Sequence, residues 1–317
     1  KTIILNMNSE IKKINLTHSF IFFLFSCILP VIIFKLNNFN IPPLICLLLI
    51  LTIGVSHGSL DHVKGKKLFN ILNINKISMF YFSYILIAIL VIITWIIIPY
   101  ISLMIFLLVA SYHFGKEDTQ FLIDVNSYFN QLLFFLKGLL IIVAPMFFHF
   151  EETVTIFKLL LVDNEIFYST LEFIEVNKIL PIAIILSSLS SIFLFLRKFE
   201  IKKFIVFFDY FSILVLNYYL TPLVAFTVYF CFLHSIRHSI TLIYEIDKND
   251  FKNGLKVFGQ KALPLTILTA IFCLIGLYLL NNNYDFDSSI LKIIFIGLAS
   301  LTFPHILLEY FLEKNEK

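Results

Sequence analysis

The chain has 317 residues, of which 59% are hydrophobic and only 14% are charged, and its mean hydropathy is +0.93. Soluble domains carry about 25% charged residues, so this composition excludes an ordinary soluble domain. The formal net charge of +3 is too small to indicate a nucleic-acid partner. Apolar runs of about 17 to 22 residues recur along the chain, each long enough to cross a hydrocarbon core of about 30 Å. We therefore predict an all-α, polytopic integral membrane protein surrounded by membrane lipid.

We predict about ten transmembrane helices, several of which end near a proline, a residue that has no N–H to donate within a helix. They form one transmembrane catalytic domain over residues 18–312, between a cytoplasmic segment at 1–17 and a cytoplasmic tail at 313–317. Residues 150–178 are expected to form a loop between the fifth and sixth spans. The predicted spans are residues 18–36, 42–60, 79–98, 101–115, 130–149, 179–197, 204–219, 221–240, 262–281 and 290–312.

Lysine and arginine are concentrated in alternate loops, after the second, sixth and eighth spans. By the positive-inside rule these loops are cytoplasmic, and so are both termini. The chain is thus expected to be a multi-pass protein of the cell (inner) membrane, with its second, fourth, eighth and tenth spans running from outside to inside. The basic residues are Lys64, Lys66, Lys67, Lys76, Arg197, Lys198, Lys202, Lys203, Lys248, Lys252, Lys256 and Lys261.

Four histidines are predicted to lie at similar depth near the cytoplasmic ends of parallel spans. His57 lies in the second span, His113 in the fourth, and His234 and His238 in the eighth. Ionisable side chains within lipid-embedded helices are costly, so each is a functional candidate. Several converging imidazoles indicate a bound metal.

The four-residue spacing of His234 and His238 places both on one helix face, about 6 Å apart along the axis. This spacing suits two imidazoles on one ion. The alternative is that each imidazole bonds separately to a backbone carbonyl of a neighbouring helix. The predicted ligand set contains no carboxylate or thiolate, and we expect no pair of acidic residues within the membrane.

Four further residues have two or more interpretations. Asp61 follows His57 by four residues, so it either accepts the imidazole N–H of His57 and orients the ring or is solvated at the start of a basic loop. His305, in the tenth span, could be a further ligand, a residue that orients a ligand, or a structural hydrogen-bond partner. Asp118, five residues after His113, is expected in a loop, the alternative being that it orients a metal-binding histidine. Arg237 is expected to contact lipid phosphate or a loop.

The metal is not determined by imidazoles alone, because iron, copper and zinc all accept them. Octahedral iron with four histidines keeps open positions for dioxygen, whereas zinc favours a closed tetrahedron. The sequence HExxH is absent, which argues against an intramembrane metalloprotease.

Two other classes of protein remain possible from the histidines alone. One is a metal or proton transporter that uses the histidines as a relay, and the other is a haem electron carrier with two histidine ligands.

Four short motifs resemble those of the Brp/Blh family of bacterial and archaeal membrane β-carotene 15,15′-dioxygenases, over about residues 50–310. The resemblance implies an Fe2+ enzyme that uses O2 to split the central double bond of β-carotene into two molecules of all-trans-retinal. It implies that His57, His113, His234 and His238 are the iron ligands, and that the retinal serves a microbial rhodopsin. The motifs are SHGSLDH (56–62), SYHFGKED (111–118), HSIRH (234–238) and TFPHILLE (302–309).

Overall fold

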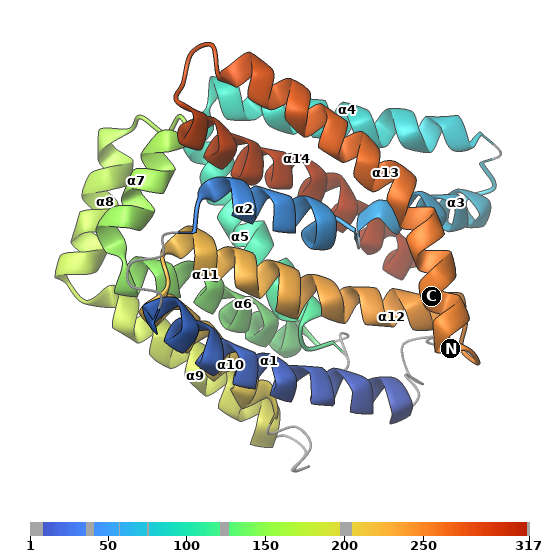
Figure 1. Ribbon diagram of the computed structural model, residues 1–317, viewed down its shortest axis with the longest axis horizontal. Coiled ribbons are helices and arrows are strands. Elements are labelled where there is room, and N and C mark those ends of the chain that lie inside the picture. Colours follow the sequence, from blue (N-terminus) through green and yellow to red (C-terminus); the bar gives the residue numbers. More distant parts are fainter. Residues whose placement is uncertain are drawn as a thin grey trace.

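The computed structural model describes residues 9–35, 41–56, 58–74, 76–120, 127–196 and 205–315. The regular structure within these ranges is entirely helical, as predicted, and long helices lie side by side in a bundle (Figure 1). One predicted ligand, His57, lies outside the described residues.

The helices follow the hydrophobic pattern of the sequence, and two of them contain a π-helical segment. Helix α1 starts and helix α14 ends at the same end of the bundle (Figure 1). In chain order the elements are α1 (Ser9–Lys35), α2 (Pro43–Leu49), the π-helix η2 (Ile50–Gly54), the 3-10 turn η3 (Gly58–Leu60), α3 (Asp61–Ile71), α4 (Ile77–Ile97), α5 (Pro99–Glu117), α6 (Tyr128–Phe148), α7 (Phe150–Leu159), α8 (Glu165–Val176), α9 (Ile179–Leu196), α10 (Ile205–Tyr219), α11 (Pro222–Val228), the π-helix η5 (Tyr229–Ser235), α12 (Ile236–Ile246), α13 (Phe251–Leu280) and α14 (Phe286–Asn315).

Several of these helices are long and apolar enough to cross a membrane. Within the described residues there are 6 such helices, or up to 8 if each of two bent helix pairs counts as one span. The predicted count of ten is therefore not confirmed, although each of the ten predicted segments is largely helical where the structure describes it. The segments at 101–115 and 204–219 correspond to α5 and α10, which are not among these spans. Helix α5 ends in polar residues, and only 15 residues of α10 are described.

The segment at 150–178 is not the loop that we predicted. It forms helices α7 and α8, each of which buries one face: Val154 and Phe157 on α7, and Phe167 and Leu171 on α8. Apolar residues at helical spacing outweigh the acidic residues that suggested a solvated loop.

Helices α5 and α6 pack with their backbones in direct contact. A Cβ built at Gly115 would lie 1.8 Å from the carbonyl oxygen of Phe134, and one built at Gly138 would lie 1.8 Å from that of Ser111. Only glycine permits such an approach, as in other closely packed membrane helices. Because Gly115 lies two residues after His113, this contact fixes the end of α5 that carries the histidine.

The π-helical segments η2 and η5 pack against each other. The Ser235 hydroxyl donates to the Gly54 carbonyl at 3.0 Å, and a Cβ at Gly54 would lie 2.6 Å from Cε1 of Phe230. A π-turn shifts the helical register by one residue and is frequent at functional sites. Here η5 contains His234, so the bulge sets the direction in which that imidazole points.

We predict that Gly138→Ala destabilises the protein, because the added methyl group would force α5 and α6 apart. Overpacking of this kind costs about 1–3 kcal/mol, which lowers the thermal unfolding midpoint by roughly 3–10 °C. Thermal unfolding in detergent measures it. The matched control is Gly259→Ala on α13, where an added Cβ meets nothing within 4 Å. An equal midpoint for both variants would contradict the close packing.

Candidate functional site

Four histidines meet inside the bundle, near the end where α5 terminates. His113 comes from α5, His234 from η5, His238 from α12 and His305 from α14, and all four are buried. The ring centroids of His113 and His234, and of His113 and His305, are 5.4 Å apart, and those of His238 and His305 are 5.8 Å apart. Imidazoles that share one ion at about 2.1 Å have centroids roughly 5 Å apart. The spacing fits a shared ion.

Three of these imidazoles have a carboxylate at Nδ1, each from a different acidic residue. His305 Nδ1 donates to Asp61 at 2.9 Å, and His238 Nδ1 donates to Glu117 at 2.9 Å. The Asp118 carboxylate lies 3.3 Å from His234 Nδ1. A carboxylate at one ring nitrogen leaves the lone pair on the other, as in many metal sites. The Nε2 atoms are therefore the atoms suited to bind a cation.

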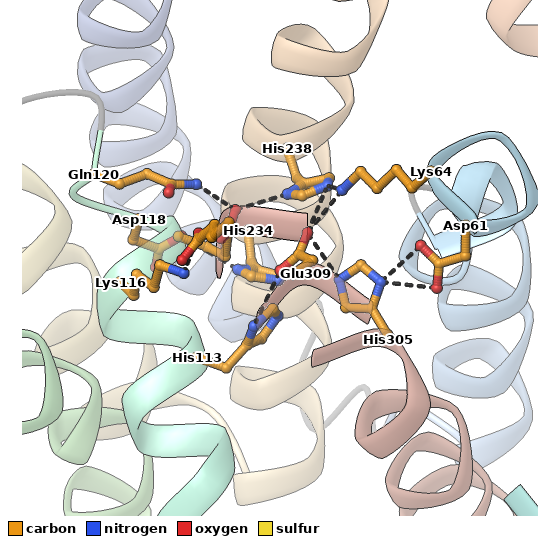
Figure 2. A network of polar contacts seen from close by, with 12 residues as sticks. Asp61, Lys64, His113, Lys116, Asp118, Gln120, His234, His238, His305 and Glu309 are labelled. Carbon is orange, nitrogen blue, oxygen red and sulfur yellow. Dashed lines mark hydrogen bonds and ion pairs between the residues drawn. The ribbon is translucent and has the colours of Figure 1, made fainter. Parts of the chain in front are cut away.

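Glu309 lies among the imidazoles (Figure 2). Its carboxylate oxygens are 3.5 Å from His305 Nε2, 3.9 Å from His238 Nε2 and 4.0 Å from His113 Nδ1. Two groups of three could hold a metal, with ligand atoms within 4.8 Å of one another: His113, His305 and Glu309, and Glu117, His238 and Glu309. The expectation that no pair of acidic residues lies within the membrane helices is wrong, because Glu117 and Glu309 form one.

The sequence contained a signal for both glutamates. Glu117 follows His113 by four residues, and Glu309 follows His305 by four, which is the same spacing that singled out His234 and His238. Residues four apart lie on one helix face. A search for all histidine–acid pairs at this spacing would have found them.

Asp61 is buried and so is not the solvated loop residue that one interpretation required. It accepts the hydrogen bond from His305, and Tyr84 donates to its second oxygen at 2.7 Å. Asp61 is the first residue of helix α3 (Asp61–Ile71), so the basic segment after residue 60, which we predicted as a loop, is helical in this part. Asp61 therefore holds the imidazole of His305, while any relation to His57 lies outside the described residues.

Asp118 and Arg237 are also buried. Asp118 lies in the turn after α5, as predicted, but it faces His234. Arg237 contacts this turn, which was one of its two predicted contacts, and its burial argues against the other, a lipid phosphate. Tyr229 donates to the Asp118 carboxylate at 2.6 Å, and Arg237 donates to the Asp118 carbonyl at 3.0 Å. Arg237 also forms a bidentate pair with Asp209 at 2.9 and 3.1 Å. Lys137 lies 3.8 Å from Asp209. A second charged network thus supports the histidine cluster from the side of His234.

The remaining described histidines make separate contacts. The ring nitrogens of His18, His62 and His149 lie 2.8 Å from the Phe232 carbonyl, 2.9 Å from the Ser59 carbonyl and 2.8 Å from the Asn217 carbonyl, respectively. These contacts are of the structural kind, and none of the three belongs to a group that could hold a metal.

We predict that breaking the pair of Arg237 and Asp209 is costly. Asp209→Asn leaves the guanidinium buried without its carboxylate partner, which costs about 3–5 kcal/mol. Arg237→Gln should cost a similar amount, whereas the double variant should cost less than the sum of the two single variants. Thermal unfolding of the three variants in detergent measures this coupling, and additive effects would contradict it.

The residues present fit a divalent metal ion. Imidazole nitrogen and carboxylate oxygen are the ligands of first-row divalent ions such as Fe2+ and Mn2+. The site also has the carboxylates at Nδ1 that orient metal-binding histidines. The fold and the site define an all-helical membrane protein with a buried imidazole and carboxylate cluster suited to a metal.

The comparisons with known proteins place this chain in a family. A family model described as Beta-carotene 15,15'-dioxygenase matches residues 48–313, and the chain belongs to that family of enzymes. It is 29% identical over 271 residues to a Beta-carotene 15,15'-dioxygenase of an uncultured marine bacterium, 66A03, in an alignment that covers 83% of this chain and 90% of the relative. No solved structure matches it. The family that the sequence motifs resembled is thereby confirmed.

Proposed function

We propose that this protein uses Fe2+ and O2 to cleave the central 15,15′ double bond of β-carotene into two molecules of all-trans-retinal. The observation that supports this most directly is the cluster of four buried histidines around the half-buried Glu309 in a member of this family. The histidines are His113, His234, His238 and His305. His57 is proposed as a further ligand from the sequence. Asp61 is proposed as the residue that orients His305.

The ligand residues would hold the ion at the end of α5, with the carboxylates at Nδ1 directing the Nε2 lone pairs inward. Bound Fe2+ would supply the electrons that allow dioxygen to react with a closed-shell alkene. Burial of the cluster excludes bulk water, which strengthens each electrostatic contact between the charged groups.

The overall reaction balances without a further reductant or a net proton. The double bond breaks, and each of its two carbons takes one oxygen atom of O2, so that two aldehydes form. Glu117 and Glu309 are therefore not required as a general acid and base. In this proposal they bind the cation or orient its ligands.

Aromatic side chains adjoin the cluster and would provide an apolar surface for a polyene. The ring of Phe230 stacks on His234 with centroids 5.8 Å apart, and Phe226 stacks on Phe230 at 5.6 Å. Phe295 on α14 lies 5.5 Å from Phe226. Aromatic rings favour such contacts by large apolar area and stacking. The hydrocarbon substrate would enter from membrane lipid, since it has negligible solubility in water.

We further propose that the protein lies in the inner membrane of the cell and that its retinal is passed to a microbial rhodopsin. The described helices that are long enough to span a membrane support the membrane location. The rhodopsin partner rests on the family resemblance of the sequence motifs.

We predict that the protein converts β-carotene to retinal when it is produced in a β-carotene-accumulating bacterial host. Retinal and residual carotene are measured by chromatography and normalised to folded protein. His113→Ala and His234→Ala should lose retinal formation, because each removes an imidazole from the cluster. His149→Ala is the matched control, since the described polar contacts of the His149 imidazole are with the Asn217 carbonyl and the neighbouring Glu152.

Unchanged carotene with folded, iron-supplied protein would reject β-carotene as the substrate. Retinal formation by both His113→Ala and His234→Ala would reject the proposed site but would still support the proposed reaction. Cleavage at another double bond would give aldehydes of unequal length, which the same chromatogram separates from retinal.

We predict that Asp61→Asn weakens metal binding by about 10–100-fold, the usual effect of removing a carboxylate that orients a metal-binding histidine. The amide can still accept a hydrogen bond from His305 but lacks the negative charge. Competition with a chromophoric chelator measures the metal dissociation constant. Asp247→Asn, which alters a partly exposed aspartate between α12 and α13, is the control. Equal dissociation constants would contradict the role of Asp61.

A further inference from the structure

Glu309 is shared by two sets of potential ligands. One set joins it to His113 and His305, and the other joins it to Glu117 and His238. A carboxylate shared in this way is the arrangement found in two-metal sites, where the ions lie about 3.5–4 Å apart. The cluster therefore offers two neighbouring cation positions.

The side chain of Lys64 reaches into the second position. Its ammonium Nζ donates to Glu309 Oε1 at 2.7 Å and lies 3.3 Å from His238 Nε2 (Figure 2). Because His238 Nδ1 donates to Glu117, Nε2 carries the lone pair and accepts from the ammonium. Lys64 comes from α3, and its side chain is 19% exposed. The Lys64 ammonium therefore places a positive charge among Glu117, His238 and Glu309, the ligands of the second set.

The charges outside the cluster are balanced locally. Arg237 and Lys137 lie beside Asp209, with the carboxylate of Asp118 in the same network. These two cations match the two aspartates. On another side, Lys116 donates to Glu313 at 2.5 Å, which forms a separate pair.

The charged side chains of the histidine cluster carry a net negative charge. Asp61 and Glu117, which are buried, and Glu309, whose side chain is 12% exposed, contribute three negative charges, and Lys64 contributes one positive charge. With neutral imidazoles, one divalent ion makes the cluster neutral. A second divalent ion would leave an excess of two positive charges in an interior of low dielectric constant, which is strongly unfavourable.

We propose that the ammonium of Lys64 fills the second cation position, so that the site binds one divalent ion and excludes a second. The inference rests on the proposed metal-dependent function and specifies how many ions the site binds. Removing the positive charge of Lys64 leaves Glu117, His238 and Glu309 without a cation. The second position then becomes a site for another divalent ion.

The test is a measurement of metal stoichiometry. The purified protein and its variants are loaded with Mn2+, freed of excess ion, and analysed for metal per chain by mass spectrometry. The protein should bind one ion, and Lys64→Met should bind two. Lys66→Met, on the exposed side of the same helix, should bind one. The double variant Lys64→Met with Glu117→Gln should return to one, because the second set has lost a charged ligand.

Electron paramagnetic resonance provides a readout that a merely structural lysine would not change. Two Mn2+ ions that share Glu309 should give an exchange-coupled spectrum in Lys64→Met, and a single ion should give an uncoupled one in the parent protein. Lys64→Arg keeps the charge and should retain one ion. Lys64→Gln is a second neutral variant, to be used if Lys64→Met does not fold.

Two ions in the parent protein would overturn the inference, as would a single ion in every folded neutral variant at position 64. Both results leave the proposed metal site intact. Absence of metal from the parent protein would instead overturn the proposed metal-dependent function, and the inference with it. The number of ions bound by the parent protein, together with its change on substitution, therefore distinguishes a failure of the inference from a failure of the proposed metal-dependent function.

Discussion

Compensation of buried charge is the constraint on which the rest of this structure depends. An apolar helix bundle cannot keep an ionised carboxylate without a partner, because burial of an isolated charge is prohibitively costly. Asp61, Glu117 and Asp118 each lie against a different imidazole, and these pairs join α3, α5, α12, η5 and α14. The polar contacts that prepare a cation site therefore also hold the helices in register at this end of the bundle.

His234 stands between the two charged networks of the interior. Its Nδ1 faces Asp118, which Tyr229 and the guanidinium of Arg237 hold in place. On its other side lie the Phe114 and Phe230 rings. The ring is therefore held by charge on one side and by aromatic packing on the other. A ligand held in this way loses little conformational freedom on binding an ion, which favours binding.

Sequence reasoning predicted the features that depend on helical periodicity, and it did not predict those that depend on contacts between helices. The apolar segments predicted the helices, and shared depth brought His113, His234 and His238 together. Glu309 was missed although it follows His305 by four residues, because that spacing does not show that a lysine and two further imidazoles from other helices lie around it. The burial of Asp118 and Arg237 was not expected, because sequence position cannot reveal that the turn after α5 packs against α12. The number of spans also depends on bends between helices, such as the 72° bend between α8 and α9, and hydropathy does not predict these bends.

The separation of apolar and charged surfaces at the cluster explains how one site could serve a hydrocarbon and a cation. Phe226, Phe230 and Phe295 form an aromatic column that ends at His234, whereas Lys64 and the carboxylates lie around Glu309 and His238. A polyene has no group to satisfy a buried charge, so its contact with the carboxylates would be unfavourable. The charge balance supplied by Lys64 allows those carboxylates to remain ionised beside an apolar substrate. A neutral cluster with one divalent ion is therefore the state that best accommodates both, and it follows from the placement of a single lysine on α3.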